Sequence, residues 1–178
     1  MDIVQPPISD SIRETLLTTL GDYPVRGVVS TERQTRPGFC KVAVSKVGAN
    51  QALASTGSAV VTWDTVIADT LNYFDNANDR IIPLKQGLYL VYADFDIAYP
   101  ANAGNIIGSL RFNGVAFRGG RLQIPSAVGG TLPMKMFSFC ICDGVDDYID
   151  VYCTNNLSAG ITLNAGNSLA QFLVMGPF

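Results

Sequence analysis

The hexapeptide Phe137-Ser138-Phe139-Cys140-Ile141-Cys142 alternates large side chains with small ones. Successive side chains of a β-strand point to opposite faces, so this alternation predicts a strand with two distinct faces. The stretch Tyr148-Ile149-Asp150-Val151-Tyr152-Cys153, a few residues downstream, has the same character. Asp143-Gly144, between the two stretches, predicts a turn. This part of the chain is therefore expected to be β-structure.

Outward from this stretch, short β-branched and aromatic runs recur between clusters of glycine, asparagine and proline, as strands do. Asn113-Gly114 predicts a two-residue hairpin, whereas Gly119-Gly120 and Gly129-Gly130 are expected in irregular segments. So many short strands favour an all-β fold, an antiparallel two-sheet jelly-roll sandwich. The predicted strands cover residues 41–47, 59–66, 87–97, 106–112, 115–118, 134–142, 148–153, 161–163 and 169–174.

The chain is expected to divide into an N-terminal arm, residues 1–38, and a jelly-roll trimerisation domain, residues 39–178. In the arm, Ser11-Ile12-Arg13-Glu14 fits a capping box, and Gly21 supplies a helix stop. A helix this short must dock its apolar face on its own domain or on a neighbouring particle, and both options stay open. Residues 22–38 form a polar hinge. The expected anchoring residues of the helix are Ile12, Leu16, Leu17 and Leu20.

Composition excludes several classes of partner. The 178 residues carry a net charge of −3 with scattered basic residues, which argues against nucleic acid. No apolar run reaches the roughly 18 residues of a membrane span, and the start has no basic, apolar secretory signal. Charged residues make up 15%, against about 25% in typical domains, while 48% are hydrophobic. The apolar excess fits either a large core or a surface buried on assembly.

Groups that could perform catalysis are scarce. The absence of histidine removes the commonest general base and most transition-metal sites, so no enzyme activity and no cofactor are expected. Asp94 and Asp96 share a strand face that we expect to be solvated. Asp143, Asp146 and Asp147 fit a turn better than a calcium loop. The four cysteines are Cys40, Cys140, Cys142 and Cys153. We expect them to be small core residues rather than metal ligands or disulfides.

One set of residues resembles a known family over roughly residues 52–178. Pro83 precedes Gly87-Leu88-Tyr89, which is similar to the Gly-x-Tyr strand of the globular domain of complement component one-q. The resemblance implies a tumour-necrosis-factor-like jelly roll that forms a compact homotrimer, with one sheet of each subunit around the threefold axis. The residues that carry the resemblance are Trp63, Asp69, Phe74, Ile81, Pro83, Gly87 and Tyr89.

Domains similar to this one also occur as capsid decoration proteins, spikes and fibre tips of viruses. We therefore expect a trimeric virion structural protein, of bacteriophage type and made in the host cytoplasm, that decorates or cements the capsid. Its arm would bind the major capsid protein or another virion protein. One alternative is a spike or fibre tip whose loops 100–105 and 119–130 contact a host surface receptor. Another is a bacterial or secreted ligand-binding module.

Overall fold

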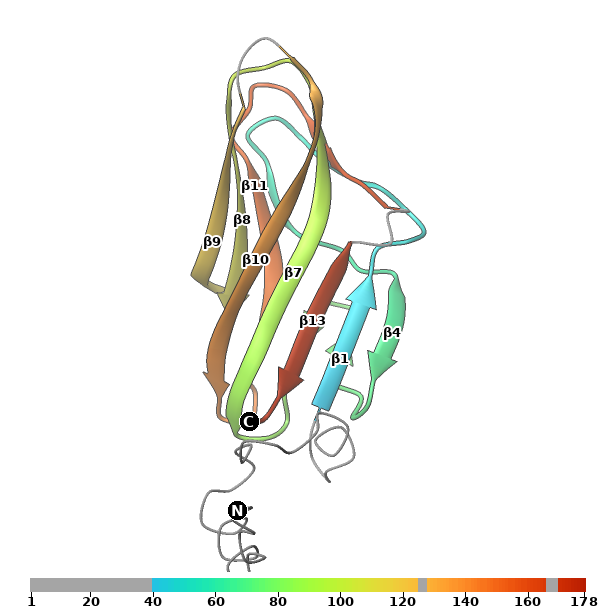
Figure 1. Ribbon diagram of the computed structural model, residues 1–178, viewed down its shortest axis with the longest axis vertical. Coiled ribbons are helices and arrows are strands. Elements are labelled where there is room, and N and C mark those ends of the chain that lie inside the picture. Colours follow the sequence, from blue (N-terminus) through green and yellow to red (C-terminus); the bar gives the residue numbers. More distant parts are fainter. Residues whose placement is uncertain (1–39, 125–127, 166–169) are drawn as a thin grey trace, which may run out of the picture.

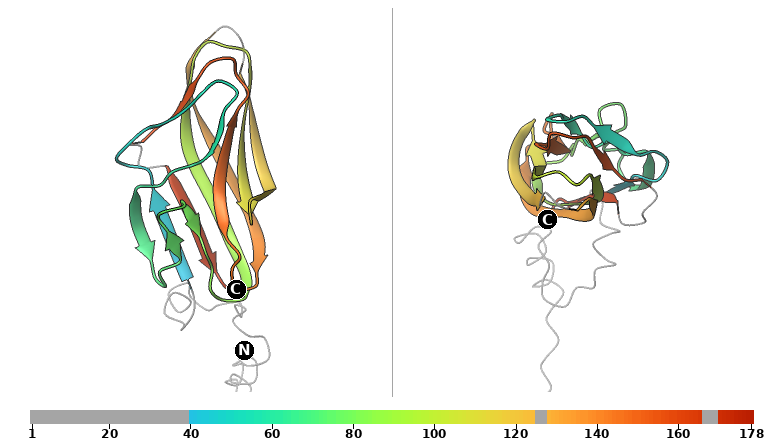
Figure 2. Two further views of the ribbon diagram at one scale, coloured as in Figure 1. Left: turned by 180° about the vertical axis from the view of Figure 1, so that it is seen from behind. Right: turned by 90° about the horizontal axis from the view of Figure 1, so that it is seen from above.

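The computed structural model describes residues 40–124, 128–165 and 170–178, and these residues form two antiparallel sheets packed face to face (Figure 1). Figure 2 shows the two layers from above, enclosing a common interior. The predicted all-β jelly-roll sandwich is confirmed. The expected arm helix and hinge, with Ile12, Leu16, Leu17 and Leu20, lie outside the described residues.

The first sheet has seven described strands, in the order β2-β12-β7-β13-β1-β4, with β10 paired to the free edge of β7. The long strand β7 lies at the centre, because β10 follows one of its edges while β13 and β12 share the other. The strands are β1 (Cys40–Ser45), β2 (Gln51–Leu53), β4 (Thr65–Asp69), β7 (Gly87–Tyr99), β10 (Gly130–Cys142), β12 (Ile161–Leu163) and β13 (Gln171–Gly176).

The second sheet has six described strands, in the order β5-β6-β11-β8-β9, with β3 also paired to β11. The predicted Asn113-Gly114 hairpin joins β8 to β9, and both turn residues have positive φ, as a type I′ turn requires. The strands are β3 (Ser58–Val60), β5 (Phe74–Asp75), β6 (Arg80–Ile81), β8 (Gly104–Phe112), β9 (Val115–Ile124) and β11 (Ile149–Asn155).

The structure corrects two of the predicted segments. Residues 59–66 form no single strand, because the chain leaves β3 at residue 61 and enters β4, in the other sheet, at residue 65. Gly119-Gly120 is not irregular but lies inside β9, opposite Ser109 and Gly108. A Cβ at Gly108 would lie 2.8 Å from Met134 Cγ, so glycine at this point of the sheet makes room for the methionine.

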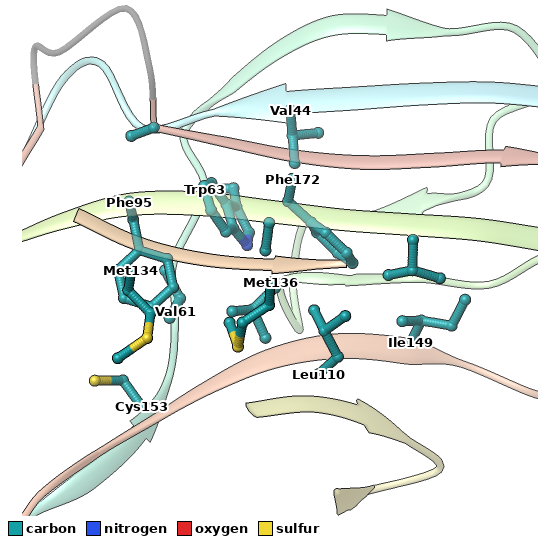
Figure 3. Packing of buried hydrophobic residues seen from close by; sticks show 14 of the residues in the cluster. Val44, Val61, Trp63, Phe95, Leu110, Met134, Met136, Ile149, Cys153 and Phe172 are labelled. Atoms are coloured by element: carbon teal, nitrogen blue, oxygen red, sulfur yellow. The ribbon is translucent and has the colours of Figure 1, made fainter. Parts of the chain in front are cut away.

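The core fills the space between the sheets (Figure 3). Trp63 and Phe172 pack with ring centroids 5.8 Å apart, and Met134 and Met136 project into the core from β10. Three of the four cysteines, Cys40, Cys142 and Cys153, are buried, and all four thiols are free. Residues on one face of each central strand therefore supply one continuous apolar interior.

Candidate functional site: the outward face of the first sheet

Cross-strand register places the outward side chains of β1, β13, β7 and β10 in rows, because directly opposed residues of antiparallel strands share a face. We call this surface the assembly face. Three of its rows are mainly apolar. They follow one another along the strands, and the third is nearest the end that holds the C-terminus. Along the strand order β1-β13-β7-β10, the first two rows are Ala43-Leu173-Tyr92-Phe137 and Lys41-Met175-Leu90-Phe139, and the third is Leu88-Ile141 on β7 and β10.

The apolar rows reach solvent most strongly on β10. Phe137, Phe139 and Ile141 are 60%, 54% and 71% exposed. The intervening small residues Ser138 and Cys140 are turned towards the core side. The other large apolar side chains that are exposed among the described residues lie on loops, on the β8–β9 hairpin or on the edge strand β4. Large exposed apolar patches often mark interaction sites, so this stripe is the candidate interaction surface of the described residues.

A fourth row of the assembly face is polar. Ser45, Gln171, Asp94 and Lys135 lie side by side across the same four strands. Asp94 is buried, and its Oδ2 accepts a hydrogen bond from the Tyr92 hydroxyl at 2.9 Å and an ion-pair contact from Lys135 Nζ at 3.1 Å. The expectation that Asp94 belongs to a solvated face is therefore wrong, because its strand neighbours cover and pair the carboxylate.

The charges of this row shift two ionisable groups. The hydrogen bond and charge of Asp94 raise the pKa of Lys135 above its ordinary value, so Lys135 stays protonated. Burial, together with the hydrogen bond to Asp94, raises the pKa of Tyr92, whose hydroxyl remains a donor at neutral pH. Tyr92, Asp94 and Lys135 thus form a fixed group of donors and one acceptor at the border of an apolar surface.

The outward face of the second sheet, which we call the solvent face, has different chemistry. Arg111 binds Asp150 through two hydrogen bonds of 2.7 Å each, and its guanidinium lies 3.9 Å from the centre of the Tyr152 ring. On the neighbouring edge Arg80 pairs with Asp75 at 2.9 Å. Both of these arginines are therefore paired within a single chain.

The residues that carry the family resemblance pack in the core or hold loops and strand ends in place. Tyr89 and Ile81 are fully buried, Trp63 and Pro83 are also buried, and Phe74 packs against the core from β5. The Asp69 carboxylate accepts the backbone N–H groups of Tyr73 and Phe74, both at 2.9 Å.

Gly87 and Tyr89 hold the start of β7 in place. The Tyr89 hydroxyl donates to the carbonyl of Lys85 at 2.8 Å. A Cβ at Gly87 would overlap the side chain of Pro177, which explains why this position takes glycine.

The acidic residues Asp143, Asp146 and Asp147 bring carboxylate oxygens within 4.8 Å of one another. Asp147 accepts the side-chain amide of Asn113 at 2.7 Å with one oxygen and the backbone N–H of Asp143 at 2.7 Å with the other. Asn113 Oδ1 in turn accepts the N–H of Tyr148 at 2.9 Å. Asp147 thus fastens the β8–β9 hairpin to the segment between β10 and β11, and Asp143-Gly144 lies in that connecting segment, where the sequence predicted a turn.

Sequence reasoning missed the assembly face as a surface. The alternation in 137–142 was a usable signal for a two-faced strand, but it did not say which face points outward. The contributions of β13 and β7, from Leu173, Met175, Leu88 and Leu90, follow only from the register.

No helix long and apolar enough to cross a bilayer occurs within residues 40–124, 128–165 and 170–178.

Comparisons with known proteins identify the fold but no family. No protein-family model matches the chain, and no curated protein matches it in sequence. Among solved structures, murine APRIL superposes with a TM-score of 0.57 at 11% sequence identity, covering 77% of this chain and 98% of that one. The structure therefore has a tumour-necrosis-factor-like jelly-roll fold.

Proposed function

We propose that the chain is the subunit of a homotrimer that buries the assembly face against further copies of itself, and that it serves as a structural component of a virus particle. In this role it decorates or reinforces a capsid and performs no catalysis. The observation that carries the proposal is the stripe of Phe137, Phe139 and Ile141 along β10, in which each side chain is more than half exposed.

Self-association follows from the physical chemistry of that face. Burying apolar surface contributes roughly 25 cal/mol per Å², and a stable interface buries about 800 Å² per partner. Two of the apolar rows cross four adjacent strands and the third crosses two, which gives a continuous patch that a second copy can cover. The likeness to a tumour-necrosis-factor-like jelly roll supports three as the number of copies.

The proposed virion role is supported by the arrangement of the chain ends and by the absence of histidine from the sequence. Cys40, the first described residue, pairs with Gly176 beside the C-terminus, so both ends of the domain lie together (Figure 1). An arm formed by residues 1–38 would extend from this end and dock Ile12, Leu16, Leu17 and Leu20 on a capsid protein. The opposite end would then face away from the particle.

Particle binding tests this role. The full chain and a chain lacking residues 1–21 are each mixed with particles stripped of the protein, and bound protein is measured after sedimentation. We expect the full chain to bind at a fixed stoichiometry and the shortened chain to lose binding while remaining trimeric. Equal binding by both chains would contradict anchoring by the arm, and a full chain that never co-sediments would contradict the virion role.

A second candidate function, a receptor-binding tip, is favoured by the chemistry of the end opposite the chain termini. The described loops there, residues 54–57, 100–103, 128–129 and 156–160, contain no charged side chain. Hydrogen bonds between Asn102 and Ser158 and between Asn156 and Asn105 fasten these loops together. A rigid, uncharged, amide-rich surface suits a neutral glycan. Saturable binding of the pure trimer to a neutral glycan array would favour this function over decoration.

A further inference from the structure

We infer that the polar row Ser45–Gln171–Asp94–Lys135 sets the register and the number of copies in the assembly. This inference rests on the proposed burial of the assembly face. The three apolar rows supply attraction, and the polar row selects one arrangement among those that attraction would allow.

An apolar surface alone specifies position poorly. Leu90, Phe139 and Ile141 would bury similar area if a neighbouring copy slid along the strands or rotated about the contact. Hydrophobic attraction is non-directional and depends mainly on the area covered. Something besides the apolar rows must therefore distinguish a closed ring from shifted or open arrangements.

The polar row has the properties that such a selector needs. Asp94 is already buried within a single chain, and the contacts from Tyr92 and Lys135 both reach its Oδ2. The Lys135 side chain remains 57% exposed beside the exposed Phe137. A copy that covers Phe137 must also meet the ammonium group of Lys135.

The cost of a wrong arrangement follows from desolvation. A neighbour that covered Lys135 and separated it from Asp94 would leave a buried charge without its partner, which is strongly unfavourable. An arrangement that keeps the pair intact avoids this cost. Buried polar groups in other assemblies fix register and copy number in this way, at some expense in stability.

The row also marks where the apolar contact must end. Asp96 lies one row further along β7, opposite Pro133, and its charge adds to that of Asp94 in holding Lys135 protonated. Apolar side chains of a neighbour that slid past the polar row would therefore meet the ammonium group of Lys135 and then the carboxylate of Asp96. The border between apolar and polar rows acts as a stop along the strand direction.

The test removes the ion pair and keeps the apolar rows. Native mass spectrometry compares the unaltered chain with the double variant Asp94→Leu/Lys135→Met and with the control Arg118→Met. The control removes one positive charge from an exposed position on β9, in the second sheet and outside the assembly face. We expect one oligomer for the unaltered chain and the control, and a mixture of dimers, trimers and larger species for the double variant.

The outcomes separate this inference from the proposed function. A double variant that remains a single trimer, beside a trimeric unaltered chain, would overturn the inference alone. A monomeric unaltered chain would overturn the proposed function and the inference with it. If the double variant fails to fold, the single variant Lys135→Gln replaces it, because this variant keeps the Tyr92–Asp94 hydrogen bond. We expect it to broaden the distribution of oligomers. A single trimer of this variant would overturn the inference.

Discussion

The two outward faces of this sandwich come from the same kind of strand but differ in how their side chains are satisfied. On the solvent face Arg111, Asp150 and Tyr152 bind one another within one chain. On the assembly face Phe137 and Phe139 have no apolar cover, although the sheet beneath them is fully built. The difference favours the first sheet, rather than the second, as the side that a further copy covers under the proposed function.

The largest expected effect is a loss of stability of the whole domain, because both sheets share one core. Tyr89→Ala deletes a fully buried ring at the start of β7 and its hydrogen bond to Lys85. We expect the free energy of unfolding to fall by about 3–5 kcal/mol, as for other large aromatic truncations. Chemical denaturation monitored by circular dichroism measures this. An unchanged transition midpoint would contradict the placement of Tyr89 in the shared core.

The next largest effect distinguishes the two faces, because it alters assembly and leaves the fold intact. Phe139→Asp places a charge in the middle of the apolar rows, where burial without a partner is costly. We expect the mass in solution to fall from about 57 kDa, three times the 19.1 kDa of the chain, to that of one chain. Circular dichroism should remain that of a folded β protein.

The matched control for that change is Val115→Asp. Val115 is 70% exposed, but it lies on β9 of the second sheet. Its replacement should leave the mass unchanged. Loss of assembly by both variants to the same extent would erase the distinction between the faces.

A smaller effect is expected on the solvent face. Arg111→Met leaves the carboxylate of Asp150, whose side chain is 5% exposed, without its bidentate partner. We expect a loss of about 1–3 kcal/mol in the free energy of unfolding, the range for a buried polar group deprived of its hydrogen bonds. Sedimentation should show that the number of copies stays the same. Dissociation of the assembly by this variant would show that the face also contacts a partner.

The smallest effect lies outside both faces and depends on pH. Burial acts to raise the pKa of Asp64, but the N–H donors of Val47, Gly48 and Ala49 outweigh it and lower that pKa to about 2. Because the folded pKa lies below the ordinary value of 3.8, Asp64 stabilises the fold above pH 3.8, and this contribution is lost as the pH falls towards 2. The melting temperature of Asp64→Asn should therefore change less between pH 5 and pH 2.5 than that of the unaltered chain, and an equal change in both would contradict the assignment.

The sequence predicted the sandwich well because most strands carry local signals. The alternation in 137–142, the Asn113-Gly114 turn and the runs of β-branched residues depend on a few neighbouring residues. The short strands β5 and β6 escaped prediction because two residues carry no periodicity. The extent of β9 escaped prediction too, because Gly120 is required by the close approach of Met134, a residue remote in sequence.

The assembly face was harder to predict for a reason visible in one hexapeptide. Large residues of a strand are ordinarily expected to point inward, but here Phe137, Phe139 and Ile141 point outward while Cys142 is buried. Only the packing of Met134 and Met136 beneath β10 shows which side is the core (Figure 3). Which face of such a strand points into the core is decided by the second sheet, whose residues lie far away in sequence.

Sedimentation equilibrium of the unaltered chain at micromolar concentration tests the central claim most directly. If the outward rows of the first sheet are buried between copies, the chain sediments as one species of about 57 kDa, three times the chain mass. A stable, non-aggregating species of 19.1 kDa would show that those rows remain in water, and would contradict the account.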